Sequence, residues 1–156
     1  TSYAPLMAHA DGWQWTPDMI WFNNLESYGT PNYYVQKLYA TNRGTDLISV
    51  TQDGENLVGQ DELYASATLD TEAKEVVVKV VNTSSEAQEV TLNFDGKKLK
   101  GKGKAIVLKE ADLNKENSFE SQQEIAPVTE ELKVKKDVAT YEVSAYSLNI
   151  IRIPLK

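Results

Sequence analysis

The sequence predicts a mainly β protein, an antiparallel, jelly-roll-like β-sandwich, preceded by a shorter segment of a different kind. Most of the aromatic residues of this 156-residue chain, including all three tryptophans, lie within its first 39 positions. After Asp46, short runs of alternating apolar and polar residues follow one another and are separated by polar turns. We therefore divide the chain into residues 1–45 and a sandwich domain of residues 46–156.

The first 45 residues are expected to form a strand, an ordered loop and a helix. Residues 1–11 are small and apolar, and Pro5 disfavours a continuous helix, so they are interpreted as the end of a buried strand. Residues 12–24 are too aromatic for a free linker and too irregular for a strand. Thr30 and Pro31 are typical of a helix start, with the threonine oxygen accepting a hydrogen bond from a free N–H group.

The helix is predicted to span residues 31–41. Its apolar face would consist of Tyr34, Val35, Leu38 and Tyr39, with Asn32, Gln36 and Lys37 toward water. Asn42, Arg43 and Gly44 provide its end.

The alternating runs predict eight strands, at residues 46–50, 62–70, 74–82, 88–94, 104–109, 131–135, 139–144 and 147–154. Val76, Val78 and Val80 share one face of the third run, as alternation in a half-buried strand requires. Residues 111–127 contain few apolar side chains and are expected to cross over between the two sheets. Asp53 to Asn56 is interpreted as a turn, and the lysines of residues 97–104 as a solvated hairpin tip that discourages edge pairing.

Composition excludes several classes of function. The net charge of −7, from 23 acidic and 16 basic residues, disfavours nucleic acid and anionic membranes as partners. The chain has no cysteine, so it has no thiolate nucleophile or thiolate metal site, and a histidine-based zinc site or a Ser-His-Asp triad would depend on His9 alone. We expect no metal and no cofactor.

The aromatic segment allows two interpretations. Trp13, Trp15 and Trp21 lie among carboxylate and amide side chains, the combination with which proteins stack on and hydrogen-bond sugars. Alternatively, tryptophans so close together fill a hydrophobic interface between two domains. Asp11 and Asp18 are poor candidates for the two carboxyl groups of a glycosidase, because their neighbours Gly12 and Pro17 place both in ordinary turn or capping positions.

Several ordered motifs resemble a known family. They are Ser2 to Leu6, Trp15 to Asn23, Tyr28 to Gln36, Glu116 to Phe119 and Pro127 to Thr129, which together cover most of the chain. They resemble the α-L-arabinofuranosidases of glycoside hydrolase family 51, in the branch shared by plants and Bacteroidetes. Such enzymes carry a (β/α)₈ barrel followed by a C-terminal β-sandwich and remove terminal arabinofuranose from arabinan and arabinoxylan with retention.

The resemblance implies that residues 1–45 are the remnant of a barrel, comprising its last strand, the loop after it on the catalytic face and its last helix. The two catalytic glutamates of the family would lie upstream of Thr1, so no catalytic residue is assigned within this chain. Asp18 falls nearest the position from which relatives contact arabinose, and Trp13 and Trp15 would form walls of the same pocket. The resemblance also implies a secreted or periplasmic parent enzyme.

Three hypotheses follow. The chain is a catalytically silent C-terminal portion of an arabinofuranosidase, or its sandwich is a carbohydrate-binding module. The third hypothesis, compatible with the first, is that the sandwich braces the barrel through the apolar face of the helix. Under the first and third hypotheses, the partners of the chain are the arabinose-containing polysaccharide and its own catalytic barrel. The isolated chain is expected to self-associate through the surface that the barrel would cover.

Overall fold

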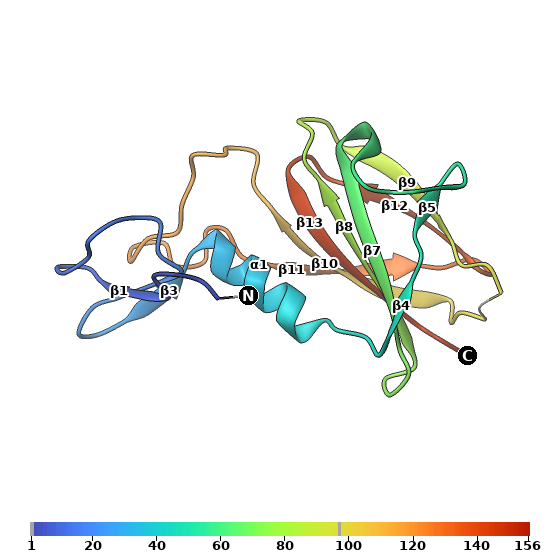
Figure 1. The fold of residues 1–156 in the computed structure, drawn as a ribbon, viewed down its shortest axis with the longest axis horizontal. Coiled ribbons are helices and arrows are strands. Elements are labelled where there is room, and N and C mark those ends of the chain that lie inside the picture. The colour runs from blue at the N-terminus through green and yellow to red at the C-terminus, as the bar shows by residue number, and fades with distance from the viewer. Residues whose placement is uncertain (1, 97) are drawn as a thin grey trace.

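The computed structural model describes residues 2–96 and 98–156 and confirms a mainly antiparallel β fold. Its N-terminal part is a small sheet of three strands, β1 (Met7–His9), β2 (Ile20–Phe22) and β3 (Ser27–Gly29). Helix α1 (Pro31–Thr41) follows directly. In Figure 1 this part lies at one end of the molecule and the sandwich at the other, with α1 beside the large sheet.

The sandwich is built on a six-stranded antiparallel sheet in the order β11-β10-β13-β8-β7-β4. Its strands are β4 (Asp46–Ile48), β7 (Leu63–Asp70), β8 (Glu75–Asn82), β10 (Lys102–Lys109), β11 (Val128–Lys133) and β13 (Ser147–Pro154). A second layer contains β9 (Gln88–Asn93) paired with β12 (Val138–Val143). A short hairpin joins β5 (Thr51–Gln52) to β6 (Glu55–Asn56), and the 3₁₀ turn η1 (Gln60–Glu62) precedes β7.

The large sheet is buried on both of its faces. Toward β9 and β12, Val76, Val78 and Val80 pack with Ile151 and Ile153 in one apolar core, as the alternation predicted. Because α1 covers the opposite face, the side chains between them are also buried and form a second core, made of Leu38, Val77, Leu108, Ile125, Leu148 and Ile150. This double burial explains why β8 and β13 are nearly continuous apolar runs rather than clean alternations.

The helix bounds agree with the prediction, but its start is built differently. The Thr30 side chain makes no capping bond to the helix; its hydroxyl donates instead to the carbonyl of Met19, at 3.0 Å. Pro31, the first helical residue, has no N–H group and therefore needs no capping partner. The Thr30 hydroxyl instead connects the start of the helix to the small sheet. Tyr39, expected on the apolar face, is 43% exposed.

The loop predicted for residues 12–24, whose sequence is too irregular to indicate a strand, contains the strand β2. It is stabilised by pairing on both sides, parallel to β1 and antiparallel to β3. Strand β11 begins at Val128, three residues before the predicted start, because its register with β10 places Val107 opposite Val128. These differences follow from partners far along the chain rather than from local pattern.

Residues 111–127 do not cross between sheets, contrary to the prediction. They join β10 to β11, which are neighbours in the same sheet. Figure 1 shows the segment leaving that sheet and running toward the small sheet before it returns. We call residues 110–127 the arm.

Two predicted turns have different outcomes. The turn predicted for Asp53 to Asn56 is shorter: Asp53 and Gly54, with φ of 52° and 88°, form the turn of the β5–β6 hairpin, and Glu55 and Asn56 form β6. The lysine-rich stretch is not simply a hairpin tip, because Leu99 is buried, bridges to Leu155 and leads directly into β10. Lys97 lies outside the described residues. Among the described residues no helix has the length and apolarity to cross a membrane.

Candidate functional site

The aromatic segment projects two tryptophans from the small sheet. The parallel pairing of β1 and β2 is extended by hydrogen bonds from Met19 N to Pro5 O (3.3 Å) and from Ile20 N to Leu6 O (3.1 Å), which close the base of the connecting loop. Trp13 and Trp15, both on this loop, are 51% and 56% exposed. Such exposed aromatic faces are available for stacking on a ligand or on another protein surface.

Trp13 is held in place by one aromatic contact. Its ring meets that of Trp21 edge to face, with 5.9 Å between the ring centroids. Trp21 itself lies in the centre of β2, paired with Ala8 and Tyr28 on its two sides. The orientation of Trp13 therefore depends on how the small sheet is held.

Asp18, on the same loop, is buried. It is 1% exposed, and among the described residues neither oxygen of its carboxylate has a hydrogen-bond partner. Burying a carboxylate without donors is costly, so the group calls for a partner that these residues do not supply. The loop thus brings the three predicted site residues together in the chain but presents only the tryptophans at the surface.

His9 has a local structural role. Its Nδ1 accepts a hydrogen bond from the Asp11 N–H at 3.1 Å, and its ring meets Phe22 edge to face at 5.2 Å. Both contacts shape the turn after β1. The single histidine of the chain therefore stabilises the start of the aromatic loop.

Other large apolar side chains of the small sheet and its loops are exposed as well. Leu6 and Met7 are more than half exposed, and Leu25, in the turn between β2 and β3, is 94% exposed. Several large apolar side chains exposed within one short stretch of chain are expected where another molecule or domain covers them. They lie on the strands and loop expected to be the barrel remnant.

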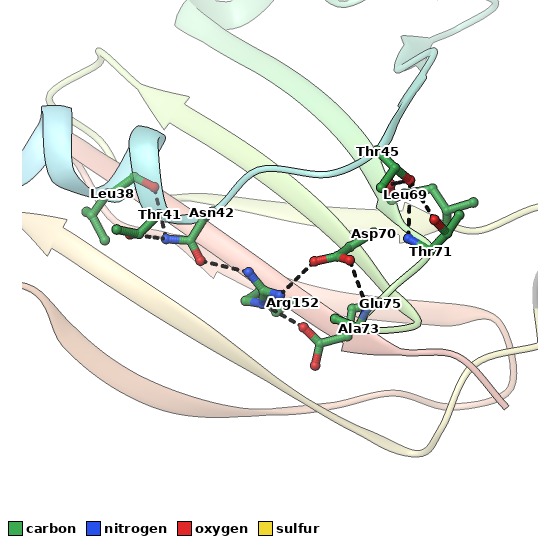
Figure 2. Close-up of polar contacts among 10 residues, drawn as sticks. All are labelled: Leu38, Thr41, Asn42, Thr45, Leu69, Asp70, Thr71, Ala73, Glu75 and Arg152. Carbon is green, nitrogen blue, oxygen red and sulfur yellow. Dashed lines mark hydrogen bonds and ion pairs between the residues drawn. The ribbon is translucent and has the colours of Figure 1, made fainter.

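Helix α1 is fixed to the sandwich by a partly buried arginine that the sequence pattern did not single out. Figure 2 shows Arg152 of β13 between the end of α1 and the turn that joins β7 to β8. Its guanidinium donates to Glu75 (2.6 Å), Asp70 (3.4 Å) and the Asn42 side-chain oxygen (3.1 Å), and its side chain is only 14% exposed. Asn42 in turn donates to the carbonyl of Leu38 at 2.9 Å, so the network ends the helix and anchors it.

Lys79 supports the same contact from β8. It is 8% exposed, and its ammonium lies 5.6 Å from the centroid of the Tyr39 ring. Burial, and secondarily the charge of Arg152, lowers the pKa of Lys79. The only visible signal in the sequence was two isolated basic residues within otherwise apolar strands, a pattern that marks buried charges needing partners.

Comparison with known proteins shows the family to which this chain is related. The domain family described as Alpha-L-arabinofuranosidase C-terminal domain matches residues 1–147. A probable α-L-arabinofuranosidase A of Aspergillus oryzae is 31% identical over 96% of this chain and 23% of its own length. The α-L-arabinofuranosidase 2 of Arabidopsis thaliana is 30% identical over 99% of the chain and 24% of its own length.

The same relationship is seen among solved structures. An arabinose-bound α-L-arabinofuranosidase of glycoside hydrolase family 51 superposes on 99% of this chain with a TM-score of 0.86 and 26% identity, the match covering 24% of that protein. The arabinose complex of the Thermotoga maritima enzyme shares the fold over 86% of the chain, with a TM-score of 0.71 and 20% identity.

These matches define a C-terminal region of glycoside hydrolases of family 51, as the motifs of the sequence indicated. The chain belongs to the α-L-arabinofuranosidase C-terminal domain family. It spans about a quarter of the length of the curated relatives that it matches.

Proposed function

We propose that this chain is the C-terminal portion of a retaining α-L-arabinofuranosidase that removes terminal arabinofuranose from arabinan and arabinoxylan. The observation that carries the proposal is the superposition of nearly the whole chain on an arabinose-bound enzyme of family 51. Matches of about 30% identity to plant and fungal arabinofuranosidases support the same activity for the parent protein.

In this proposal the chain alone is catalytically silent. Retaining glycosidases need two carboxyl groups ~5–5.5 Å apart on either side of the scissile bond. Asp18 is buried and Asp11 is exposed, so the two do not form such a pair. We assign neither of them as the proton donor or the nucleophile. The catalytic glutamates would belong to a barrel outside residues 1–156, and residues 1–45 would complete that barrel.

The aromatic loop would contribute one wall of the sugar site. Trp13 and Trp15 offer exposed indole faces to the apolar face of a sugar ring. Asp18, whose carboxylate has no hydrogen-bond partner among the described residues and is covered by this chain, would meet the sugar or the barrel only if the loop around it rearranged in the parent enzyme. The sandwich would brace this wall through α1, its Arg152 network and the arm.

The parent enzyme is further proposed to be secreted or periplasmic, since its polysaccharide substrates are too large to enter a cell. The apolar surface around Leu6, Met7 and Leu25 would face the rest of the barrel. In the isolated chain that surface would favour self-association, which size-exclusion chromatography measures directly.

The proposal is tested with an aryl α-L-arabinofuranoside offered separately to the parent enzyme and to residues 1–156. The parent should release the aryl group and the isolated chain should not. Robust turnover by the isolated chain would defeat the silent-portion hypothesis, and an inactive parent would defeat the assignment of activity.

A second candidate, a carbohydrate-binding module, is favoured by one observation. Tyr64, on strand β7 of the sandwich, is 48% exposed. Calorimetric titration of the isolated chain with arabino-oligosaccharides separates the two: heat of binding that disappears in Tyr64→Ala would indicate a sandwich site, whereas heat that disappears in Trp13→Ala would locate binding at the aromatic loop.

A further inference from the structure

The arm is longer than its connection requires. Strands β10 and β11 are antiparallel neighbours with Val107 opposite Val128, and such pairs are commonly joined by roughly two to five residues. Residues 110–127 instead leave the sheet and reach β3 at the far end of α1. Additional chain of this kind, fixed at a distant element, has a role beyond closing the turn.

The base of the arm is anchored in the core between the helix and the sheet. Ile125 is 4% exposed and packs with Leu38, Leu108 and Ile150. Within the arm, Lys115 pairs with Glu124, and Ser118 and Ser121 exchange backbone hydrogen bonds of 3.2 and 3.3 Å. The arm is therefore a braced structure able to hold another element in position.

Its tip holds β3 through one buried amide. Asn117 is 3% exposed, and its Nδ2 donates to the carbonyls of Gly29 (2.9 Å) and Ile125 (3.0 Å). Its Oδ1 accepts from the Ile125 N–H at 2.7 Å. Both ends of the amide are thus satisfied, and one of its three bonds connects the sandwich arm to the small sheet.

Two more contacts reach β3 and the turn just before it. The ring of Phe119 meets that of Tyr28 edge to face, with 5.0 Å between centroids, and Gln122 donates to the Glu26 carboxylate. Tyr28 is directly opposite Trp21 in the β2–β3 register, and the Trp21 ring supports Trp13. A continuous path of contacts therefore runs from the arm through β3 and β2 to an exposed tryptophan of the loop.

We propose that Asn117 and Phe119 are positioning residues through which the sandwich sets the geometry of the sugar-contacting aromatic loop. This inference rests on the proposed function for its effect on catalysis, but the contacts themselves are independent of it. Neither residue would touch the sugar; each holds β3, and β3 holds β2 and Trp13. Small displacements of groups that position a substrate are enough to lower activity by ~100-fold.

The experiment compares four variants of the parent enzyme. Asn117→Ala removes the amide and Phe119→Leu removes the ring while keeping an apolar side chain; Phe119→Tyr keeps the ring, and Asn114→Ala alters an exposed asparagine of the same arm. The first two should raise KM for an aryl α-L-arabinofuranoside by ~10-fold with kcat changed by less than ~3-fold. The other two should match the wild type.

Hydrogen exchange on the full chain provides a readout independent of catalysis. Asn117→Ala and Phe119→Leu should speed amide exchange across residues 20–29 while strands β8 and β13 keep wild-type protection. Wild-type exchange over residues 20–29 in both variants, or unchanged KM in an active parent, would overturn the positioning role. If Asn117→Ala does not fold, the comparison of Phe119→Leu with Phe119→Tyr, in KM and in amide exchange, tests the positioning role. An inactive wild-type parent would instead count against the proposed function, and exchange alone would then decide the positioning role.

Discussion

Replacement of Arg152 by methionine should weaken the whole chain, because one guanidinium joins α1 to the sandwich. Methionine keeps an apolar stem of similar reach and removes the three hydrogen bonds to Glu75, Asp70 and Asn42. The variant leaves two acidic side chains, each 19% exposed, without their cation. A buried charge that loses its partner is more costly than a lost surface pair.

The magnitude follows from these contacts. Hydrogen bonds to charged groups contribute about 1.5–3 kcal/mol each, and the partial exposure of both carboxylates allows water to replace part of that loss. We expect the free energy of unfolding to fall by about 3 kcal/mol, which for a chain of this size corresponds to a decrease in Tm of about 6–12 °C.

Urea denaturation followed by circular dichroism measures this change, with Arg43→Met as the matched control. Arg43 is an exposed arginine next to Asn42, and its replacement should alter the free energy of unfolding by less than about 0.5 kcal/mol. A loss below about 1 kcal/mol in Arg152→Met would place the network in the class of surface ion pairs and refute the reasoning.

Three further changes have defined outcomes. Asp18→Asn should raise the free energy of unfolding of the isolated chain, because burying a neutral amide costs less than burying a carboxylate that has no hydrogen-bond donor among the described residues; a loss of stability in thermal melts would contradict this. Leu38→Ala should cost about 2–5 kcal/mol in urea titrations, since Leu38 fills the core between α1 and the sheet, and a cost near that of an exposed site would show that the helix packs loosely. Burial, with the charges of Glu130 and Glu142, raises the pKa of Tyr141 to about 12. Because the unfolded tyrosine loses its proton near pH ~10, stability should fall as pH rises from about 10 to about 12, and Tyr141→Phe should abolish that Tyr141-dependent part of the decline.

The regular elements could be predicted because their signals are local. Pro31 and the apolar spacing of Val35 and Leu38 define α1, and the alternation of Val76, Val78 and Val80 defines a core strand. Local signals of this kind are present in any window of the sequence that is long enough to show a period.

The elements missed from sequence depend on contacts between distant residues. Strand β2 has three residues, too few to display a period, and exists because β1 and β3 pair with it. The arm looked like a crossover, since nothing local shows that Asn117 meets Gly29. The burial of Asp18 was also invisible, because a Pro-Asp pair is usual at an exposed turn.

The candidate site was predicted in composition but not in geometry. The sequence pointed to Trp13, Trp15 and Asp18, and the structure places all three on one loop with the tryptophans outward and the carboxylate inward. Which side of a loop a side chain occupies is decided by the packing of the small sheet, which no spacing rule encodes.

The most direct test of the central claim is the kcat/KM of the parent enzyme for an arabino-oligosaccharide after aromatic truncation. Trp13→Ala and Trp15→Ala should each lower kcat/KM by ~10-fold, as expected when a contact residue at a binding surface loses its side chain. Tyr64→Ala, which removes a similarly exposed ring from the sandwich, should leave kcat/KM unchanged. Wild-type kcat/KM in both tryptophan variants, or a loss confined to Tyr64→Ala, would contradict the account.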